Sequence, residues 1–209
     1  MDERLVVVQH HPAEGIGELG VWADRNGIAL DVVRADLDAL PPSSKWPCVL
    51  LGGPYSVNAA PGWLRHEKLW LHEAVAADTA ILGICLGSQL LAEALGGRVH
   101  PMQEPETGWT RIAFDDGSAF DALQWHEDTF TRPPGSESLA CSAACVSQVF
   151  RLGNRIGIQF HPEWNAALVV DLNAHFGADS PLPRDIDHER HARVAVWFHR
   201  LLDDWRASW

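Results

Sequence analysis

The stretch "ILGICLGSQ" holds one cysteine, Cys85, with Gly83 two residues before it and Gly87 two residues after it. The apolar residues before Cys85 are typical of a buried strand, and the residues after it are typical of a helix. Glycines permit a tight strand-to-helix turn, which would expose the sulfur above the helix start. Because a helix N-terminus stabilises negative charge, this position favours a thiolate nucleophile. For the motif alone, a buried and inert cysteine is the alternative.

A thiolate nucleophile needs a base, and the base needs a group that orients it. The segment "GIQFHPE" places His161 at the end of an apolar run, with Glu163 two residues later. Pro162 cannot continue a strand, so the side chains of His161 and Glu163 should lie at the carboxyl end of that strand. The carboxylate can then hold one ring nitrogen and leave the other for sulfur. A polar turn after a strand is the alternative reading of His161 by itself.

Two further stretches offer polar groups for the same edge. "LLGGP" ends an apolar run with Gly52 and Gly53, whose unhindered amides could stabilise an oxyanion. "LQWHEDTF" offers His126 and Asp128 beside a predicted strand. We take Gly52, His126 and Asp128 as candidate substrate contacts. An ordinary turn and a solvated loop are the structural alternatives for the two stretches.

Strands and helices alternate in the first half of the chain, which predicts a doubly wound, mostly parallel α/β sheet with helices on both faces. The expected strands are 4–9, 28–34, 47–54 and 80–84, and the expected helices are 14–26, 63–77 and 87–95. After Gly97 we expect mainly strands, and then helices at 165–176 and 185–205. No linker or repeat interrupts the pattern, so residues 1–209 are expected to form one domain. Functional groups in such sheets gather at the carboxyl ends of the strands.

Composition narrows the classes of function. The chain has 209 residues and a formal net charge of -12, which disfavours binding to nucleic acids and anionic membranes. The four cysteines follow no disulfide or zinc spacing, so no metal site is expected. The acidic N-terminus and its short apolar run do not resemble a signal peptide. We therefore expect a cytoplasmic protein.

The segments "LLGGP", "GICLGSQLLAEALGG", "WHED" and "GIQFHPE" together resemble the class I glutamine amidotransferase family, in particular the amidotransferase domain of GMP synthase. The resemblance implies a flavodoxin-like sheet and no cofactor. It implies that Cys85 is the nucleophile, His161 the general base and acid, and Glu163 the orienting carboxylate. Gly53 and Leu86 would supply the oxyanion amides. Gln89 would line the substrate pocket, and Asp128 would face the substrate's α-amino group.

The implied reaction is hydrolysis of the glutamine side-chain amide through a γ-glutamyl thioester, with ammonia passing to a separate synthetase partner. Trp125 and Glu127 depart from the GMP synthase pattern, which puts the specificity for glutamine in question. A stand-alone γ-glutamyl hydrolase is therefore one alternative, and a non-catalytic regulatory subunit on the same fold is another. The apolar C-terminal helix should pack on its own domain, with a homodimer contact as the alternative.

Overall fold

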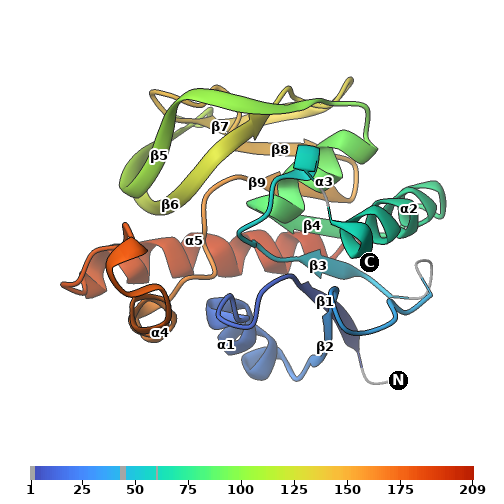
Figure 1. The fold of residues 1–209 in the computed structure, drawn as a ribbon, viewed down its shortest axis with the longest axis horizontal. Coiled ribbons are helices and arrows are strands. Elements are labelled where there is room, and N and C mark those ends of the chain that lie inside the picture. Colours follow the sequence, from blue (N-terminus) through green and yellow to red (C-terminus); the bar gives the residue numbers. More distant parts are fainter. Residues whose placement is uncertain (1–2, 43–45, 60) are drawn as a thin grey trace.

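The computed structural model describes residues 3–42, 46–59 and 61–209. Within these ranges one sheet has the strand order β2-β1-β3-β4-β9-β8-β7-β5-β6 (Figure 1). Its parallel half consists of β2 (Ala29–Arg34), β1 (Arg4–Gln9), β3 (Cys48–Leu50), β4 (Ile81–Ile84) and β9 (Arg155–Ile158). This order of the parallel strands is the flavodoxin-like order. The predicted fold class is confirmed.

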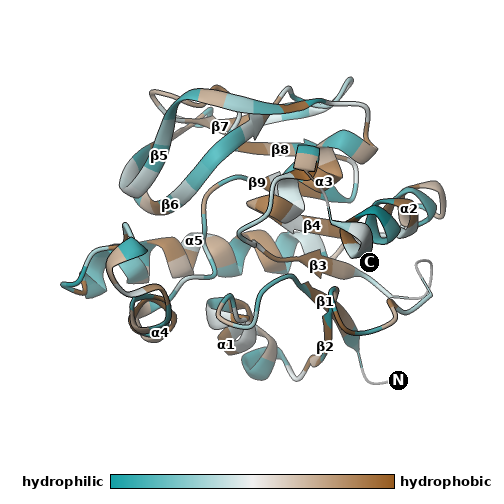
Figure 2. Cartoon of the chain, viewed as in Figure 1, coloured by the Kyte–Doolittle hydropathy of each residue, from teal (hydrophilic) through white to brown (hydrophobic). Residues whose placement is uncertain are grey.

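Helices cover both faces of the parallel half, because alternate residues of a strand point to opposite faces. In β1, Leu5 and Val7 join the core formed with α1 (Gly17–Asn26) and α5 (His188–Arg206). Val6 and Val8 join the core formed with α2 (Gly62–Ala76) and α3 (Leu86–Ala94). The central strands are accordingly among the most hydrophobic segments of the chain (Figure 2). This double covering holds the carboxyl ends of β1, β3, β4 and β9 at one rigid edge.

The other half of the sheet is antiparallel and extends beyond β9. It consists of β8 (Val149–Leu152), β7 (Glu137–Cys141), β5 (Val99–Phe114) and β6 (Ala119–Phe130). The region after Gly97, where the sequence predicts mainly strands, begins with one long strand, β5, whose pairing with β6 shifts between Pro101 and Glu106. Figure 1 shows the β5–β6 hairpin arching over the carboxyl edge of the parallel strands.

The remaining elements are α4 (Ala166–Phe176) and two short 3-10 helices, η1 (Val57–Ala59) and η2 (Gly177–Asp179). The C-terminal helix α5 packs on the core of its own chain through Phe198, Leu202 and Trp205, whereas Val196 is exposed. Among the described helices, none combines the length and the hydropathy that crossing a bilayer requires.

Candidate active site

Cys85 occupies a strained turn between β4 and α3. Its φ and ψ angles are 48° and -109°, a conformation that residues other than glycine rarely adopt. The backbone N–H of Cys85 donates to Ile158 O at 2.8 Å, and Gly87 N donates to Leu51 O at 3.1 Å. These bonds fix the turn to the ends of β9 and β3. Such a nucleophile elbow presents the side chain above the edge of the sheet.

The two flanking glycines are required by close backbone packing. A Cβ atom on Gly83 would lie 2.4 Å from the carbonyl oxygen of Gly87. A Cβ on Gly87 would lie 2.2 Å from the carbonyl oxygen of Leu50. Real Cβ atoms do not approach this closely, so α3 can start directly over β3 and β4 only because both positions lack a side chain.

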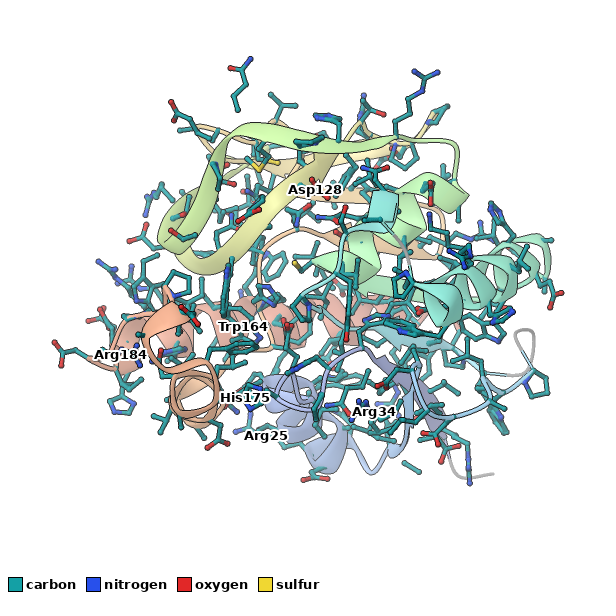
Figure 3. The ribbon with its side chains drawn as sticks, in the orientation of Figure 1. Arg25, Arg34, Asp128, Trp164, His175 and Arg184 are labelled. Carbon is teal, nitrogen blue, oxygen red and sulfur yellow. The ribbon has the colours of Figure 1, made fainter. Side chains whose placement is uncertain are left out.

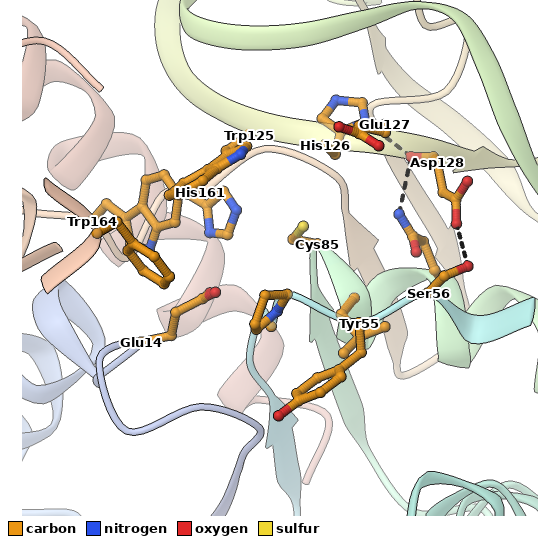
Figure 4. Close-up of a pocket in the computed structure, with 15 residues that line it drawn as sticks. Glu14, Tyr55, Ser56, Cys85, Trp125, His126, Glu127, Asp128, His161 and Trp164 are labelled. Atoms are coloured by element: carbon orange, nitrogen blue, oxygen red, sulfur yellow. Dashed lines mark hydrogen bonds between the residues drawn. The ribbon is translucent and has the colours of Figure 1, made fainter. Parts of the chain in front are cut away.

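His161 and Glu163 lie at the end of β9, beside the elbow. The Nδ1 atom of His161 is 2.7 Å from Glu163 Oε1, and both side chains are buried. The Trp164 ring stacks on the imidazole with a centroid separation of 3.5 Å and an interplanar angle of 11°. Figure 4 shows the imidazole between Cys85 and Trp164. The carboxylate and the indole together fix one orientation of the ring.

The electrostatic surroundings of His161 favour its protonated form. Burial alone would lower the pKa of His161, but the negative charge of Glu163 and the hydrogen-bonded Cys85 raise it well above its usual value. A histidine that is held protonated can give its proton to a departing group. The geometry and the charges therefore suit a cysteine nucleophile with a histidine acid and base.

A buried ion pair between His10 and Glu67 orients the Gly52–Gly53 peptide through a hydrogen bond. His10 Nδ1 lies 3.2 Å from Gly52 O, and His10 Nε2 lies 2.9 Å from Oε1 of Glu67, on α2. Both partners accept hydrogen bonds, so both ring nitrogens of His10 carry hydrogen. Burial lowers the pKa of His10, but the charge and hydrogen bond of Glu67, the hydrogen bond to Gly52 and the charge of Glu14 together raise it above its usual value. The peptide is trans, so the N–H of Gly53 points away from His10.

A cavity of about 420 Å³ opens beside Cys85. It is lined by the elbow, by His161 and Trp164, by Gly53–Ser56 and by residues 125–128 of β6. In Figure 3, Trp164 and Asp128 lie toward the inside of the view, whereas Arg184 lies at its edge. A volume of this size suits a small organic ligand.

Comparison with known proteins places this architecture in a family. The model of the class I glutamine amidotransferases matches residues 23–167. The chain belongs to this family. It is 31% identical over 192 residues to the glutamine amidotransferase-like protein YfeJ of Salmonella typhimurium, covering 82% of this chain and 80% of YfeJ. It is 38% identical over 147 residues to one subunit of a glutamine-hydrolysing GMP synthase of Saccharolobus solfataricus, covering 62% of this chain and 77% of that subunit.

A solved structure agrees with this assignment. The glutamine amidotransferase of Methylobacillus flagellatus superposes with a TM-score of 0.91 at 27% sequence identity. The match covers 100% of this chain and 96% of the other. The likeness therefore includes the antiparallel half of the sheet and the C-terminal helices as well as the segment that the family model matches.

Most residues predicted for the site of this amidotransferase line its cavity. Cys85, His161, Gly53 and Leu86 do so, together with Gln89, His126 and Asp128. Gln89 Nε2 donates to Asp128 O at 3.0 Å, and Asp128 Oδ2 accepts from Ser56 Oγ at 2.7 Å. These bonds tie α3 and the loop after β3 to the β5–β6 hairpin. The carboxylate of Asp128 is thereby oriented at the cavity wall.

Two predicted substrate contacts form hydrogen bonds within the protein. Gly52 is not among the residues that line the cavity, and its carbonyl accepts from His10. His126 lies inside β6 and is buried, so the alternative of a solvated loop does not hold for it. Its Nε2 is 3.2 Å from Oε2 of Glu106, and its Nδ1 is 2.9 Å from Asp128 O. Both nitrogens of His126 are therefore engaged within the protein, which suits support of the cavity wall better than substrate contact.

Several residues at the site carry no role in the sequence-based prediction, among them His10, Glu14, Glu67 and Trp164. His10 and Glu14 belong to "HHPAEG", which directly follows β1. Because β1 is parallel to β3 and β4, that position was a usable signal: polar residues at its carboxyl end share the edge with Cys85. The helix predicted from Glu14 in fact begins at Gly17, so Glu14 lies in the loop that faces the cavity.

Proposed function

We propose that this chain hydrolyses the side-chain amide of glutamine, or of a related γ-glutamyl compound, through a thioester on Cys85. The observation that carries the proposal is the alignment of Glu163, His161 and Cys85 at the carboxyl ends of β9 and β4, with Cys85 held at positive φ. Membership of the class I glutamine amidotransferase family supports the same chemistry.

The steps follow from the placement of the groups. The Cys85 thiolate attacks the amide carbon, and the amide oxygen becomes an oxyanion. The N–H of Leu86, in the first turn of α3, has no intrahelical acceptor and can donate to the oxyanion, as can the N–H of Gly53. Protonated His161 gives its proton to the departing nitrogen, and the C–N bond breaks. Water, deprotonated by His161, then cleaves the thioester and releases the γ-carboxylate.

We also propose that ammonia formed here passes to an acceptor on a separate chain. The matched GMP synthase relative of Saccharolobus solfataricus is itself named as a subunit, which supports a division between an amidotransferase and a partner. Glutamine binding would use Asp128, which is oriented by Ser56, to pair with the α-ammonium group.

The test is glutamate release from L-glutamine by the purified chain, with Cys85→Ala as the control. Release that disappears in Cys85→Ala supports the proposal. Release that persists in Cys85→Ala would refute the assigned nucleophile. If glutamine is inert but γ-glutamyl peptides are cleaved in a Cys85-dependent manner, the site is that of a stand-alone γ-glutamyl hydrolase.

A further inference from the structure

Glu14 is a buried carboxyl group whose hydrogen bonding is incomplete. Its side chain lines the cavity beside Cys85, and the residue is only 8% exposed. Within the described part of the chain, Oε2 of Glu14 has no hydrogen-bond partner. Figure 4 shows the carboxyl group pointing toward the centre of the pocket. A buried oxygen without a partner costs free energy that a ligand donating a hydrogen bond would recover.

Glu14 lies on the His161 side of the cavity. A Cβ on Gly52 would be 2.5 Å from Oε2 of Glu14 and 2.7 Å from Cε1 of His161, so the two side chains flank one point. In Figure 4, Asp128 and Ser56 lie on the opposite side of Cys85 from Glu14 and Trp164. His161 must reach the departing nitrogen, so the leaving group belongs on its side. The glutamyl part then extends toward Asp128, and Glu14 faces the leaving group.

The other residues that line the cavity favour a positive charge on the leaving group. Trp125, Trp164 and Phe176 contribute aromatic surface to the cavity, and aromatic faces attract cations. The lining residues within the described ranges include three carboxyl groups, Glu14, Glu127 and Asp128, and the protonated imidazole of His161, but neither Lys nor Arg. An anionic leaving group would therefore meet more like charges than opposite ones. A second ammonium group would meet an unpaired carboxyl oxygen.

We infer that the site takes γ-glutamyl amides whose leaving amine carries a second, positively charged amino group, with Glu14 as the counter-ion of that group. The inference rests on the proposed hydrolysis at Cys85. In the reaction, the γ-glutamyl C–N bond breaks, the diamine leaves with a proton from His161, and water completes the γ-carboxylate. Overall, one water is consumed, and glutamate and a diamine are released.

The experiment compares three γ-glutamyl amides of matched length: those of 1,4-diaminobutane, n-butylamine and 4-aminobutyrate. Their affinities for Cys85→Ala are measured by calorimetry, which needs no turnover. We expect the cationic amide to bind at least about 10-fold more tightly than the neutral one, because a charged hydrogen bond replaces an unpaired oxygen. The anionic amide should bind most weakly.

Adding Glu14→Gln to Cys85→Ala should reduce the preference to within about twofold, because the amide cannot supply the charge. Glu73→Gln, at an exposed position on α2, is the matched control and should keep the preference. Burial raises the pKa of Glu14 to about 7. Binding of the cationic amide near neutral pH should therefore release protons, and Glu14→Gln should abolish that release. A structural role for Glu14 would not produce this signature.

The inference is overturned if the neutral or anionic amide binds as tightly as the cationic one, or if the preference survives Glu14→Gln. Parallel assays of glutamate release by the wild-type chain separate this inference from the proposed function. Hydrolysis of glutamine without any charge preference would refute the role of Glu14 and leave the hydrolase proposal standing. Charge-selective binding without hydrolysis of any amide would refute the hydrolase proposal and leave the binding site standing.

Discussion

Glu67 is predicted to control the oxyanion-binding peptide through His10, and Glu67→Gln tests this. The substitution keeps the shape of the side chain and removes its charge. Glu67 and His10 are 1% and 0% exposed, so the imidazolium of His10 would lose a buried counter-ion. It would then lose a proton, because burial lowers its pKa and Glu67 supplies the largest opposing effect. The neutral ring of His10 would donate its one hydrogen from Nε2 to the introduced amide oxygen. Its Nδ1 would then carry no hydrogen and could not donate to Gly52 O.

The size of the effect follows from the oxyanion-binding role proposed for the Gly53 N–H. Complete loss of an oxyanion donor typically lowers kcat by about 100- to 1,000-fold. In Glu67→Gln the Gly53 N–H remains but loses its fixed orientation, so we expect kcat to fall by about 10- to 100-fold near pH 8. KM for glutamine should change by less than about threefold, because the oxyanion exists only in the transition state. The free energy of unfolding should fall by about 1.5–3 kcal/mol.

The assay is the initial rate of glutamate release from glutamine, measured for both proteins at about pH 6 and about pH 8. Lower pH favours the imidazolium of His10, so the hydrogen bond from its Nδ1 to Gly52 O should be partly restored at about pH 6. The ratio of wild-type to variant kcat should therefore be smaller at pH 6. Taking the ratio cancels the titration of His161, which both proteins share. Glu73→Gln, on the same helix, is the control for a lost carboxylate.

Two results would refute this reasoning. One is a Glu67→Gln protein that unfolds cooperatively but has wild-type kcat at both pH values. The other is a kcat ratio that does not change with pH, since a merely structural defect would lower the rate without responding to protonation of His10.

The other predictions concern the nucleophile, its base and the unpaired carboxyl. Glu163→Gln should lower kcat by at least about 100-fold in the same assay, because the charge that holds His161 protonated and oriented is lost; activity within threefold of wild type would contradict this. Gly83→Ala should lower the free energy of unfolding by at least about 2 kcal/mol in urea titrations, because its Cβ would lie 2.4 Å from Gly87 O. Glu14→Gln should raise stability at alkaline pH. The pKa of Glu14 rises from 4.5 to about 7 on folding, so its wild-type contribution is complete below about pH 4.5 and is lost as the pH rises through 7. Chemical denaturation should therefore show little difference between the proteins at pH 4.5 and an advantage for Glu14→Gln of about 3 kcal/mol at pH 8. An equal difference at both values would show that Glu14 is not titrating in this range.

The residues whose placement the sequence predicts well are those with local signals. Cys85 is flanked by glycines and stands between an apolar run and an amphipathic segment, and His161 follows an apolar run and precedes a proline. Each of these signals spans fewer than ten residues. The order of the strands then places the ends of β4 and β9 side by side, as the register Ile84↔Ile158 shows.

The residues that the sequence does not predict depend on contacts across the sheet. His10 becomes relevant only because β1 is the neighbour of β3, with Val8 opposite Leu50. Its partner Glu67 lies on α2, where apolar Leu64 and Leu71 set the periodicity and a buried carboxylate looks like a surface residue. Trp164 is one of ten tryptophans, and only its stacking on His161 distinguishes it. The sequence around Glu67 and Trp164 carries no signal of these contacts, and that around His10 carries only its position after β1.

Gly52 lies next to His10, which the sequence does not predict, and to His161, which it does. Its carbonyl receives the His10 hydrogen bond that orients the Gly53 N–H, while its missing side chain leaves room for Glu14 beside His161. A side chain here would displace either the carboxyl group or the imidazole edge, since a Cβ would lie within 2.7 Å of both. The glycine is therefore required by two adjacent side chains, not by its own backbone conformation. In the proposed reaction, the same loop after β1 would thus supply the support for the oxyanion peptide, through His10, and the carboxyl group that faces the leaving amine, through Glu14.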